Sequence, residues 1–419
     1  MIYNRRTQLI SVSEALQRLL SSFHPLQSEM VSLADAAGRV LYEGIRSDLD
    51  LPLFTNSSMD GFAIRSQDVH KASKDNPIQL SIVEDIPAGK TPTIGLGKNQ
   101  ASRIMTGAPL PEGADAVIPV ENTDQFDPKT QTSSGKTGEV WIYQSAKPGD
   151  FVRHRGEDVH EGDLILEANA PLKPQELGIL AMLGKAEVSV YRRPKIAIVS
   201  TGDELVPLGK TLKSGQIHDS NAYTLFALIK RDYADAQYLG IVPDNEESVT
   251  EILKSAVDIK ADLILSSAGV SVGVFDYVRK VVQREGELDF WRVNMRPGKP
   301  IAFGNFHGVR FIGLPGNPVS AFVGYEVFVR PAILKLSGIP RVPRHKLKAR
   351  LVEEIESDGR ESYLRGIVTF ENSEWSARLT GHQGSGNMLS LVHANALLVI
   401  PSGVKSLAAG MEVDTWLLE

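Results

Sequence analysis

Short apolar runs alternate with stretches of helical periodicity in the middle of this chain. Between residues 191 and 338, each run is followed by a loop and then by a segment whose apolar residues recur at helical spacing. Alternation of this kind predicts an α/β domain built on a doubly wound parallel sheet. The expected strands are residues 196–200, 236–242, 262–266 and 309–313.

The flanking parts of the chain follow other patterns. Residues 51–150 contain strand-like runs that proline and glycine interrupt often, which predicts a β-rich lobe. Residues 1–50 and 151–190 combine helical and extended patterns, and we expect them to form a helical or mixed arm. Residues 339–419 contain five short strand candidates separated by turn residues, which predicts a small β-barrel. The chain is therefore expected to be an α/β multi-domain protein.

Helix signals are clearest in the arm. Val12–Leu20 has helical spacing of its apolar residues, and Pro174 is a favourable first residue for a second helix that Gly184 would end. Ser32–Leu41 predicts a further short helix, interrupted at Gly38. These signals are local, so each of them predicts an element and leaves its packing open.

Composition limits the classes of function. The 419 residues carry a net charge of −6, which argues weakly against a nucleic-acid partner. The chain has no cysteine, which excludes disulfides, thiolate metal sites and a cysteine nucleophile. Neither a signal peptide nor an apolar run long enough to cross a membrane is visible. We therefore expect a cytoplasmic protein with no membrane partner.

Two glycine-bearing loops follow predicted strands of the α/β domain. One contains Gly269 and Gly273, which permit close approach of the backbone to a ligand, and the other is Gly-Leu-Pro-Gly-Asn-Pro at residues 313–318. In open parallel sheets, ligands bind at the carboxyl ends of the strands, where such loops lie. The region from residue 263 to residue 320 is therefore predicted to be a ligand-binding edge.

Carboxylates also fall at these strand ends. Asp203, Glu204, Asp244 and Asp276 each stand at or just after a predicted strand or glycine loop. Mg²⁺ prefers a few carboxylates completed by water and substrate phosphate, so the group suggests a magnesium site. The simpler alternatives are that Asp244 caps a helix and that Asp203 is a turn residue.

Fixed positive charge and a serine motif stand near the same edge. Arg296 and Lys299 occur in Met-Arg-Pro-Gly-Lys-Pro, a stiff segment suited to holding an anion. Residues 269–273 also match Gly-x-Ser-x-Gly, the nucleophile elbow of hydrolases. Three of the four later histidines fall in the β-rich C-terminal part, which argues against a serine hydrolase and leaves that function as an alternative.

A series of longer motifs runs through the chain in this order: MDGFAI, IMTGAPLPEGADAVIPVE, PGDFVRHRGEDV, STGDEL, GVSVGVFDYV, PGKPIAFG and GLPGNPVSAF. The series resembles the molybdopterin molybdenumtransferase (MoeA) family, which includes the E domain of gephyrin. The resemblance extends from about Val12 to the C-terminus. It implies a homodimer with a shared active cleft, and four parts: a helical dimer arm, a β-rich lobe, a molybdopterin-binding α/β domain and a β-barrel.

The reaction that the resemblance implies is insertion of molybdate into adenylylated molybdopterin, with release of AMP and molybdenum cofactor and with Mg²⁺ as cofactor. The family's adenylyltransferase and acceptor molybdoenzymes would be further partners. The catalytic positions implied by motif are Asp60, Thr106, Asp158, Glu204, Asp244 and Asp276, with Glu204 and Asp276 on the metal. The pterin and phosphate site would include Gly269, Ser271, Gly273, Gly316, Asn317 and Pro318. The implied molybdate pocket consists of Arg296, Lys299, Arg365 and Ser385.

Two positions depart from the family pattern. Ala268 stands where glycine is common, and Arg296 where lysine is common. Arg296 keeps the charge but changes its reach and geometry. A paralogue that prefers tungstate and a non-catalytic scaffold that binds molybdopterin are the alternatives that remain.

Overall fold

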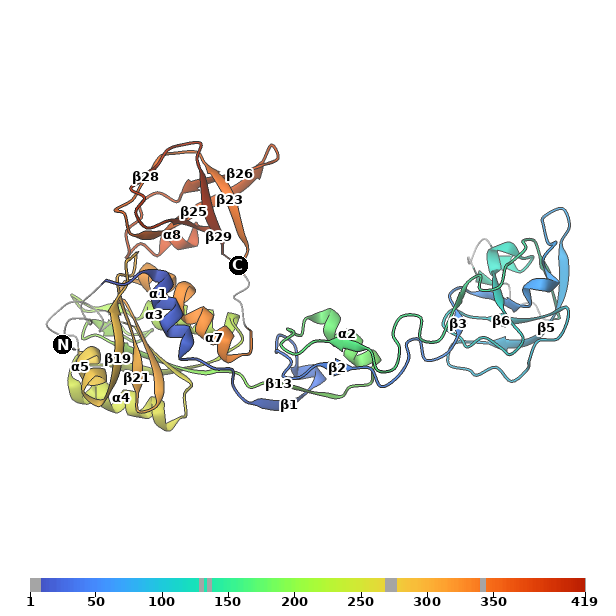
Figure 1. Ribbon diagram of the computed structural model, residues 1–419, viewed down its shortest axis with the longest axis horizontal. Helices are drawn as coiled ribbons and strands as arrows, with labels where there is room; N and C mark the ends of the chain where they lie inside the picture. The colour runs from blue at the N-terminus through green and yellow to red at the C-terminus, as the bar shows by residue number, and fades with distance from the viewer. Residues whose placement is uncertain (1–8, 128–131, 134–137, 268–276, 340–343, 419) are drawn as a thin grey trace. The chain divides into compact units, whose positions relative to one another are not determined.

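The computed structural model describes residues 9–127, 132–133, 138–267, 277–339 and 344–418 (Figure 1). The chain forms two compact units. The larger unit consists of Met1–Glu43, Ala168–Gly178 and Lys185–Glu419, and the smaller of Gly44–Glu167 and Ile179–Gly184. Among the described residues, none of the helices is both long enough and apolar enough to span a bilayer.

A six-stranded sheet forms the centre of the larger unit (Figure 1). The four predicted strands are present and parallel, but two further strands, β21 and β19, extend the sheet in antiparallel orientation. The predicted parallel strands are confirmed, and the antiparallel edge is an addition that the sequence pattern did not predict. In order across the sheet, the strands are β17 (Asp235–Val242), β14 (Lys195–Thr201), β18 (Leu263–Ser267), β22 (Val309–Leu314), β21 (Pro300–Phe306) and β19 (Gly286–Arg292).

The antiparallel edge has a local cause in a two-residue turn. Phe306 pairs with Val309, and the two residues between them, His307 and Gly308, both have positive φ (48° and 88°). This conformation gives a tight hairpin whose twist matches the flanking strands. A hairpin leaves no room for a crossover helix, so β21 runs antiparallel to β22.

Helices cover both faces of this sheet. On β14, Ile196 and Ile198 belong to one apolar core, and Ala197 and Val199 belong to a second. The alternation arises because successive side chains of a strand point to opposite faces. The first core includes residues of α1 (Val12–Ser21), α3 (Ser220–Arg231), α6 (Pro318–Gly324) and α7 (Arg330–Leu336). The second includes α4 (Glu246–Asp258) and α5 (Tyr277–Glu285).

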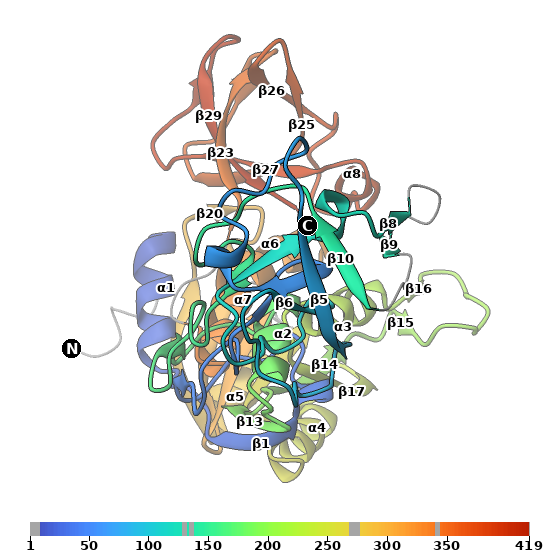
Figure 2. The same cartoon turned by 90° about the vertical axis from the view of Figure 1, so that its right-hand side faces the viewer.

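The C-terminal part is a closed five-stranded β-barrel, as predicted (Figure 2). Closure leaves no free sheet edge. A two-residue strand of the α/β part, β20 (Met295–Arg296), pairs with the first residues of β25, so the two parts are hydrogen-bonded. The barrel strands are β23 (Lys346–Leu351), β25 (Glu361–Glu371), β26 (Glu374–Leu379), β27 (Ala396–Ile400) and β29 (Glu412–Leu417).

Of the three helices predicted for the arm, two are present as α1 and α2, and the third is absent. The helix α2 covers Pro174–Met182 and is followed by Gly184 at φ 70°, as expected. The helix predicted for Ser32–Leu41 does not form, because Leu33–Asp35 is only a short 3-10 turn and Gly38 has φ 71°. The strand β1 (Ser28–Ser32) precedes that turn and pairs with β13 (Glu187–Tyr191). Local spacing of apolar residues therefore predicted a helix in a segment that tertiary pairing holds in a non-helical conformation.

The smaller unit is β-rich, in agreement with the prediction for this part of the chain. Its main sheet has an apolar core on each face. The strands, in order across the sheet, are β10 (Glu139–Ile142), β5 (Ile78–Ile86), β6 (Gln100–Ile104), β4 (Gly61–Ile64) and β7 (Ala116–Pro119).

Candidate active site

A cavity of about 380 Å³ lies where the α/β part of the larger unit meets the β-barrel. It is called the cationic cavity below, because its lining contains three arginines and a lysine but no acidic residue. Arg296–Pro300 line it from the α/β side, and Arg360, Arg365 and Gln383–Ser385 from the barrel. The remaining lining residues are Pro315, Asn317, Ser320 and Leu364.

Arg365 is the most unusual member of this lining. Its side chain on β25 is fully buried, and its guanidinium donates only to neutral oxygens: the Ser390 hydroxyl at 3.0 Å and the Gly384 carbonyl at 3.0 Å. Its Nη1 is buried without a hydrogen-bond partner among the described residues. Burial and the nearby charge of Arg296 lower the pKa of Arg365 to about 10. A buried cation without a counter-ion is costly, so an anionic ligand is the simplest explanation.

The other three cations differ in their pairing. Arg360 forms an ion pair with Asp358, which offsets its charge. Arg296 and Lys299 have no acidic partner in the described parts of the chain. Gly298, between them, has φ 100°, and Arg296 is anchored by its strand pairing with Ser362. The cationic cavity therefore has three cations that form no ion pair with a described carboxylate, although Arg360 and, to a smaller extent, Arg296 lower the pKa of Asp358.

The loop after β22 contacts the barrel at this cavity. Asn317 donates from Nδ2 to the Ser385 hydroxyl at 3.0 Å, and the Val319 amide donates to the Ser385 carbonyl at 3.1 Å. The Gly316 carbonyl accepts from Asn221 at the start of α3 at 2.7 Å. Pro318, which follows Asn317, is the first residue of α6. The structure therefore brings together Asn317 and Ser385, which the sequence analysis had predicted on separate motifs.

The predicted carboxylates form a second feature, at the ends of the adjacent strands β14 and β17. Asp203 accepts from the Asp244 amide at 3.1 Å. Burial, together with the negative charges of Asp203 and Glu204, raises the pKa of Asp244. The N-cap of α4 is Asn245, so the alternative in which Asp244 caps this helix is wrong.

A glycine before Glu204 explains part of the Ser-Thr-Gly-Asp-Glu-Leu motif. A Cβ atom at Gly202 would lie 2.6 Å from Glu204 Oε2, so a larger residue would displace this carboxylate. Among the described residues, no group of three acidic or histidine side chains is arranged to hold a metal ion. Asp276, Gly269, Ser271 and Gly273 lie outside the described residues, so this structure does not place them.

In the smaller unit, the structure brings together Asp60 and Thr106, two of the residues predicted to be catalytic. Asp60 Oδ1 accepts from both the amide and the hydroxyl of Thr106, each at 2.7 Å. Gly61 begins β4, and a Cβ atom there would lie 2.0 Å from the Ile118 carbonyl oxygen, so the strand requires glycine at this point. The predicted Asp158 forms an ion pair with Arg153.

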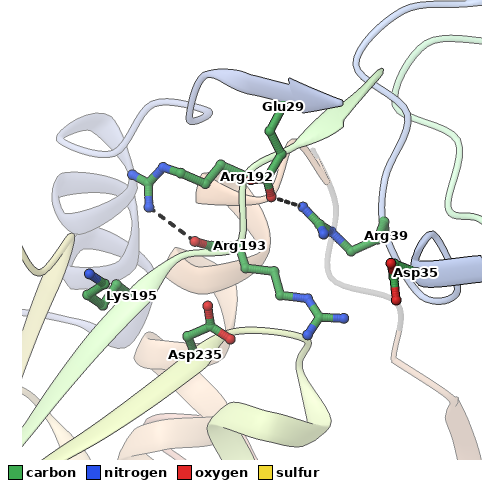
Figure 3. A pocket seen from close by; sticks show the side chains of 7 residues that line it. All are labelled: Glu29, Asp35, Arg39, Arg192, Arg193, Lys195 and Asp235. Carbon is green, nitrogen blue, oxygen red and sulfur yellow. Dashed lines mark hydrogen bonds and ion pairs between the residues drawn. The ribbon is translucent and has the colours of Figure 1, made fainter. Parts of the chain in front are cut away.

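A cavity of about 420 Å³ elsewhere in the larger unit has a different character (Figure 3). Its lining includes both basic and acidic residues, and Arg39 is directed toward Glu29, with which it forms an ion pair. Arg192 is held by Asp262 through two bonds of 2.8 and 3.0 Å. Two of its arginines are therefore neutralised within the fold, whereas Arg193 Nε is buried without a hydrogen-bond partner among the described residues. The difference from the cationic cavity lies in the acidic residues of this lining, Glu29, Asp35 and Asp235.

Sequence reasoning missed three residues of the cationic cavity and its surroundings: Arg360, Gln383 and Ser390. The last two hold Arg365. Gln383 begins the Gln-Gly-Ser-Gly motif that contains Ser385, so that motif was an available signal for it. Ser390 lies outside the motifs, and its burial is not visible in the sequence.

The two-sided α/β sheet, the β-barrel and the cationic cavity together define a multidomain α/β protein with a positively charged cavity between its α/β part and its barrel. Three family models match in sequence order: MoeA N-terminal region (domain I and II) at residues 10–184, a probable molybdopterin binding domain at 197–335, and MoeA C-terminal region (domain IV) at 348–418. The chain belongs to the MoeA family.

Individual relatives agree with this assignment. A molybdopterin molybdenumtransferase of Nostoc sp. is 39% identical over 393 residues, which is 92% of this chain and 88% of that protein. The Haemophilus influenzae protein of the same name is 36% identical and covers 97% of this chain and 98% of its own length. A crystal structure of the molybdopterin biosynthesis MoeA protein from Pyrococcus horikoshii has a TM-score of 0.80 and 30% identity, covering 98% of this chain and 100% of that one. The chain is therefore an enzyme, with a role in molybdenum cofactor biosynthesis.

Proposed function

We propose that this enzyme inserts molybdate into adenylylated molybdopterin and releases AMP and molybdenum cofactor. The cationic cavity carries the proposal, because its buried Arg365 has no acidic partner among the described residues. A tetrahedral oxyanion supplies the missing negative charge and accepts hydrogen bonds from several donors at once. The names of the relatives support molybdate as that oxyanion.

The roles of the other residues follow from where they lie. Arg296 and Lys299 neutralise the oxyanion from the α/β side of the cavity, and Ser385 contacts it from the barrel side. Asn317, bonded to Ser385, lies between this cavity and the loop Gly316–Pro318, which we assign to the pterin and its phosphates. The glycine loop with Gly269, Ser271 and Gly273 is assigned to the same ligand on its motif alone.

Magnesium fits the carboxylates near Asp244. Burial and then the negative charges of Asp203 and Glu204 raise the pKa of Asp244, and a bound cation would relieve the repulsion among these carboxylates. We assign Glu204 and Asp276 as its ligands, because Mg²⁺ is usually held by one or two carboxylates together with substrate phosphates. Bound Mg²⁺ would offset the negative charge of the pyrophosphate that is cleaved.

The remaining assignments extend the same proposal. Asp60, Thr106 and Asp158 are assigned to catalysis on their motifs, in a cytoplasmic homodimer whose active cleft is shared between subunits. The adenylyltransferase that makes the substrate and the molybdoenzymes that accept the product are its expected partners. A tungstate-preferring enzyme and a non-catalytic scaffold remain the alternatives, while membership of the MoeA family leaves the serine-hydrolase hypothesis without support.

The test follows AMP release from adenylylated molybdopterin while molybdate, tungstate and Mg²⁺ are titrated. We expect Lys299→Ala to raise the molybdate concentration required by roughly ten- to a hundredfold, the effect of one charge-assisted hydrogen bond, with little change for the nucleotide. Lys348→Ala, at an exposed lysine of the barrel, is the matched control and should change neither value. Equal losses for both ligands would mean that Lys299 binds phosphate, and absence of AMP release from the parent enzyme would favour the scaffold.

A further inference from the structure

Arg365 lies at a point of the barrel where one neighbouring strand has ended. Arg365 pairs with Leu397 of β27 on one side. On the other side, the pairing of β25 with β26 begins only one residue later, at Gly366. The Thr380 amide still donates to the Arg365 carbonyl at 3.1 Å, and the side chain of Gln383 completes the main-chain contacts on this side. Its Oε1 accepts from the Arg365 amide at 2.8 Å, and its Nε2 donates to the Arg365 carbonyl at 3.1 Å. The main chain of Arg365 is therefore held on both sides.

The side chain of Arg365 is also held by specific hydrogen bonds. Ser390, on the short helix α8 (Leu389–Val392), is 4% exposed, and its hydroxyl donates to the Asn387 carbonyl at 2.6 Å. A hydroxyl has a single hydrogen, so a lone pair of the same oxygen faces Arg365 Nε, which donates to it at 3.0 Å. The Gly384 carbonyl accepts from Nη2 at 3.0 Å.

All of these contacts on the guanidinium are with neutral acceptors. They fix its orientation without cancelling its charge, whereas a carboxylate at the same place would do both. Two of the three guanidinium nitrogens are occupied by this scaffold, and Nη1 is the one left buried without a described partner. Because Arg365 lines the cationic cavity, this nitrogen and the full positive charge remain for a ligand.

We propose that Ser390 is a positioning residue for oxyanion binding, supported by Gln383, and that its neutrality is essential to that role. Ser390 does not line the cavity, so it acts through Arg365 by holding Nε while Nη1 meets the oxyanion. This inference rests on the proposed function, because the ligand is taken to be molybdate. It adds a residue for which no motif in the sequence provides a role.

The experiment measures molybdate binding by calorimetry and the steady-state rate of AMP release with full-length enzyme. Ser390→Ala is expected to weaken molybdate binding and raise its KM on the order of tenfold, with the nucleotide KM unchanged. Ser390→Thr retains the hydroxyl and should restore most of the affinity. The matched control is Ser337→Ala, since Ser337 is also buried and also donates to a helical carbonyl, at 3.0 Å, away from the cavity.

A double-mutant cycle separates positioning from a general structural effect. If Ser390 acts through Arg365, then Ser390→Ala should have no further effect on molybdate affinity in an Arg365→Met background. An additive loss, or unchanged molybdate affinity in Ser390→Ala, would overturn the inference. If Ser390→Ala does not fold, Gln383→Ala in the parent and in the Arg365→Met background tests the support of Arg365: because Gln383 also lines the cavity, its effect on molybdate affinity counts only if it disappears without Arg365. Failure of the parent enzyme to bind molybdate or tungstate would instead overturn the proposed function.

Discussion

Two groups of arginines in the larger unit have opposite electrostatic surroundings. In the first, called the ion-pair network here, Arg231, Arg330 and Arg344 surround the buried carboxylates of Asp232 and Glu326. Arg231 lies 2.7 Å from Glu326 and 3.0 Å from Asp232, and Arg344 lies 3.0 Å from Glu326. Burial opposes the effect of these carboxylates: they raise the pKa of Arg231 above its usual value, whereas burial outweighs Glu326 at Arg344 and lowers its pKa.

The second group is the set of unpaired cations at the cationic cavity. Arg365 is as deeply buried as the network but contacts only neutral groups, and burial together with Arg296 lowers its pKa. The fold therefore neutralises the charges that it uses for its own packing and leaves the charges of the cavity unneutralised. Stability and function make opposite demands on a buried arginine, and mutations in the two groups should differ accordingly.

The largest effect on stability is expected in the ion-pair network. Glu326→Gln removes the carboxylate shared by Arg231 and Arg344, so positive charge is left buried without compensation. Breaking one partner of a buried pair costs about 3–5 kcal/mol, and we expect a loss of this size in chemical denaturation. Glu374→Gln, in the exposed pair with Arg350, is the control and should cost at most about 1 kcal/mol. A similar small loss at Glu326 would remove the contrast between the two groups.

At the cationic cavity, a substitution that removes a buried positive charge should leave the stability of the protein unchanged or increase it. Arg365→Met replaces an uncompensated buried charge by an apolar side chain of comparable length, so the ligand-free variant should be at least as stable as the parent. Its affinity for molybdate should fall by roughly ten- to a hundredfold or more, and molybdate should no longer raise its Tm. Thermal melts with and without molybdate test both parts. A destabilised variant with normal molybdate binding would assign Arg365 to packing.

The smallest effect on stability is expected at Asp244, an acidic residue with other acidic residues close by. The pKa of Asp244 is raised in the folded state, so its protonated form stabilises the fold at acid pH, and this contribution is lost as the pH rises through the folded-state pKa. Asp244→Asn has no ionisable group at this position, so its stability does not fall in this way as the pH rises. The variant should therefore be more stable than the parent at neutral pH, by less than about 1 kcal/mol, with the difference vanishing at acid pH.

Magnesium provides the second readout at Asp244. If Asp244 belongs to the electrostatic surroundings of a bound cation, added Mg²⁺ should raise the Tm of the parent more than that of Asp244→Asn. Asp258→Asn, at the last residue of α4, is a control outside the carboxylate group. Equal Mg²⁺ responses in parent and variant would separate Asp244 from the proposed metal site.

Several features of the fold were determined by the sequence at short range. The four parallel strands, the cap of α3 by Asp219 and the end of α2 before Gly184 depend on residues within a few positions of one another. The ordered motifs also predicted the family, and with it the residues Arg296, Lys299, Arg365 and Ser385 as parts of one site. Local conformational preference and motif order were enough for these conclusions, because neither requires knowledge of distant contacts.

Only the tertiary structure decided which charges are paired. Arg365 and Ser390 are 25 residues apart and Asn317 and Ser385 are 68 apart, and no pattern in the chain distinguishes these contacts from chance. Nothing in the sequence separates Arg344, which pairs with Glu326, from Arg365, which pairs with no described acid. The reason is physical: the free energy of a buried charge depends on all the groups around it, and those groups are brought together only when the barrel closes and packs on the α/β sheet.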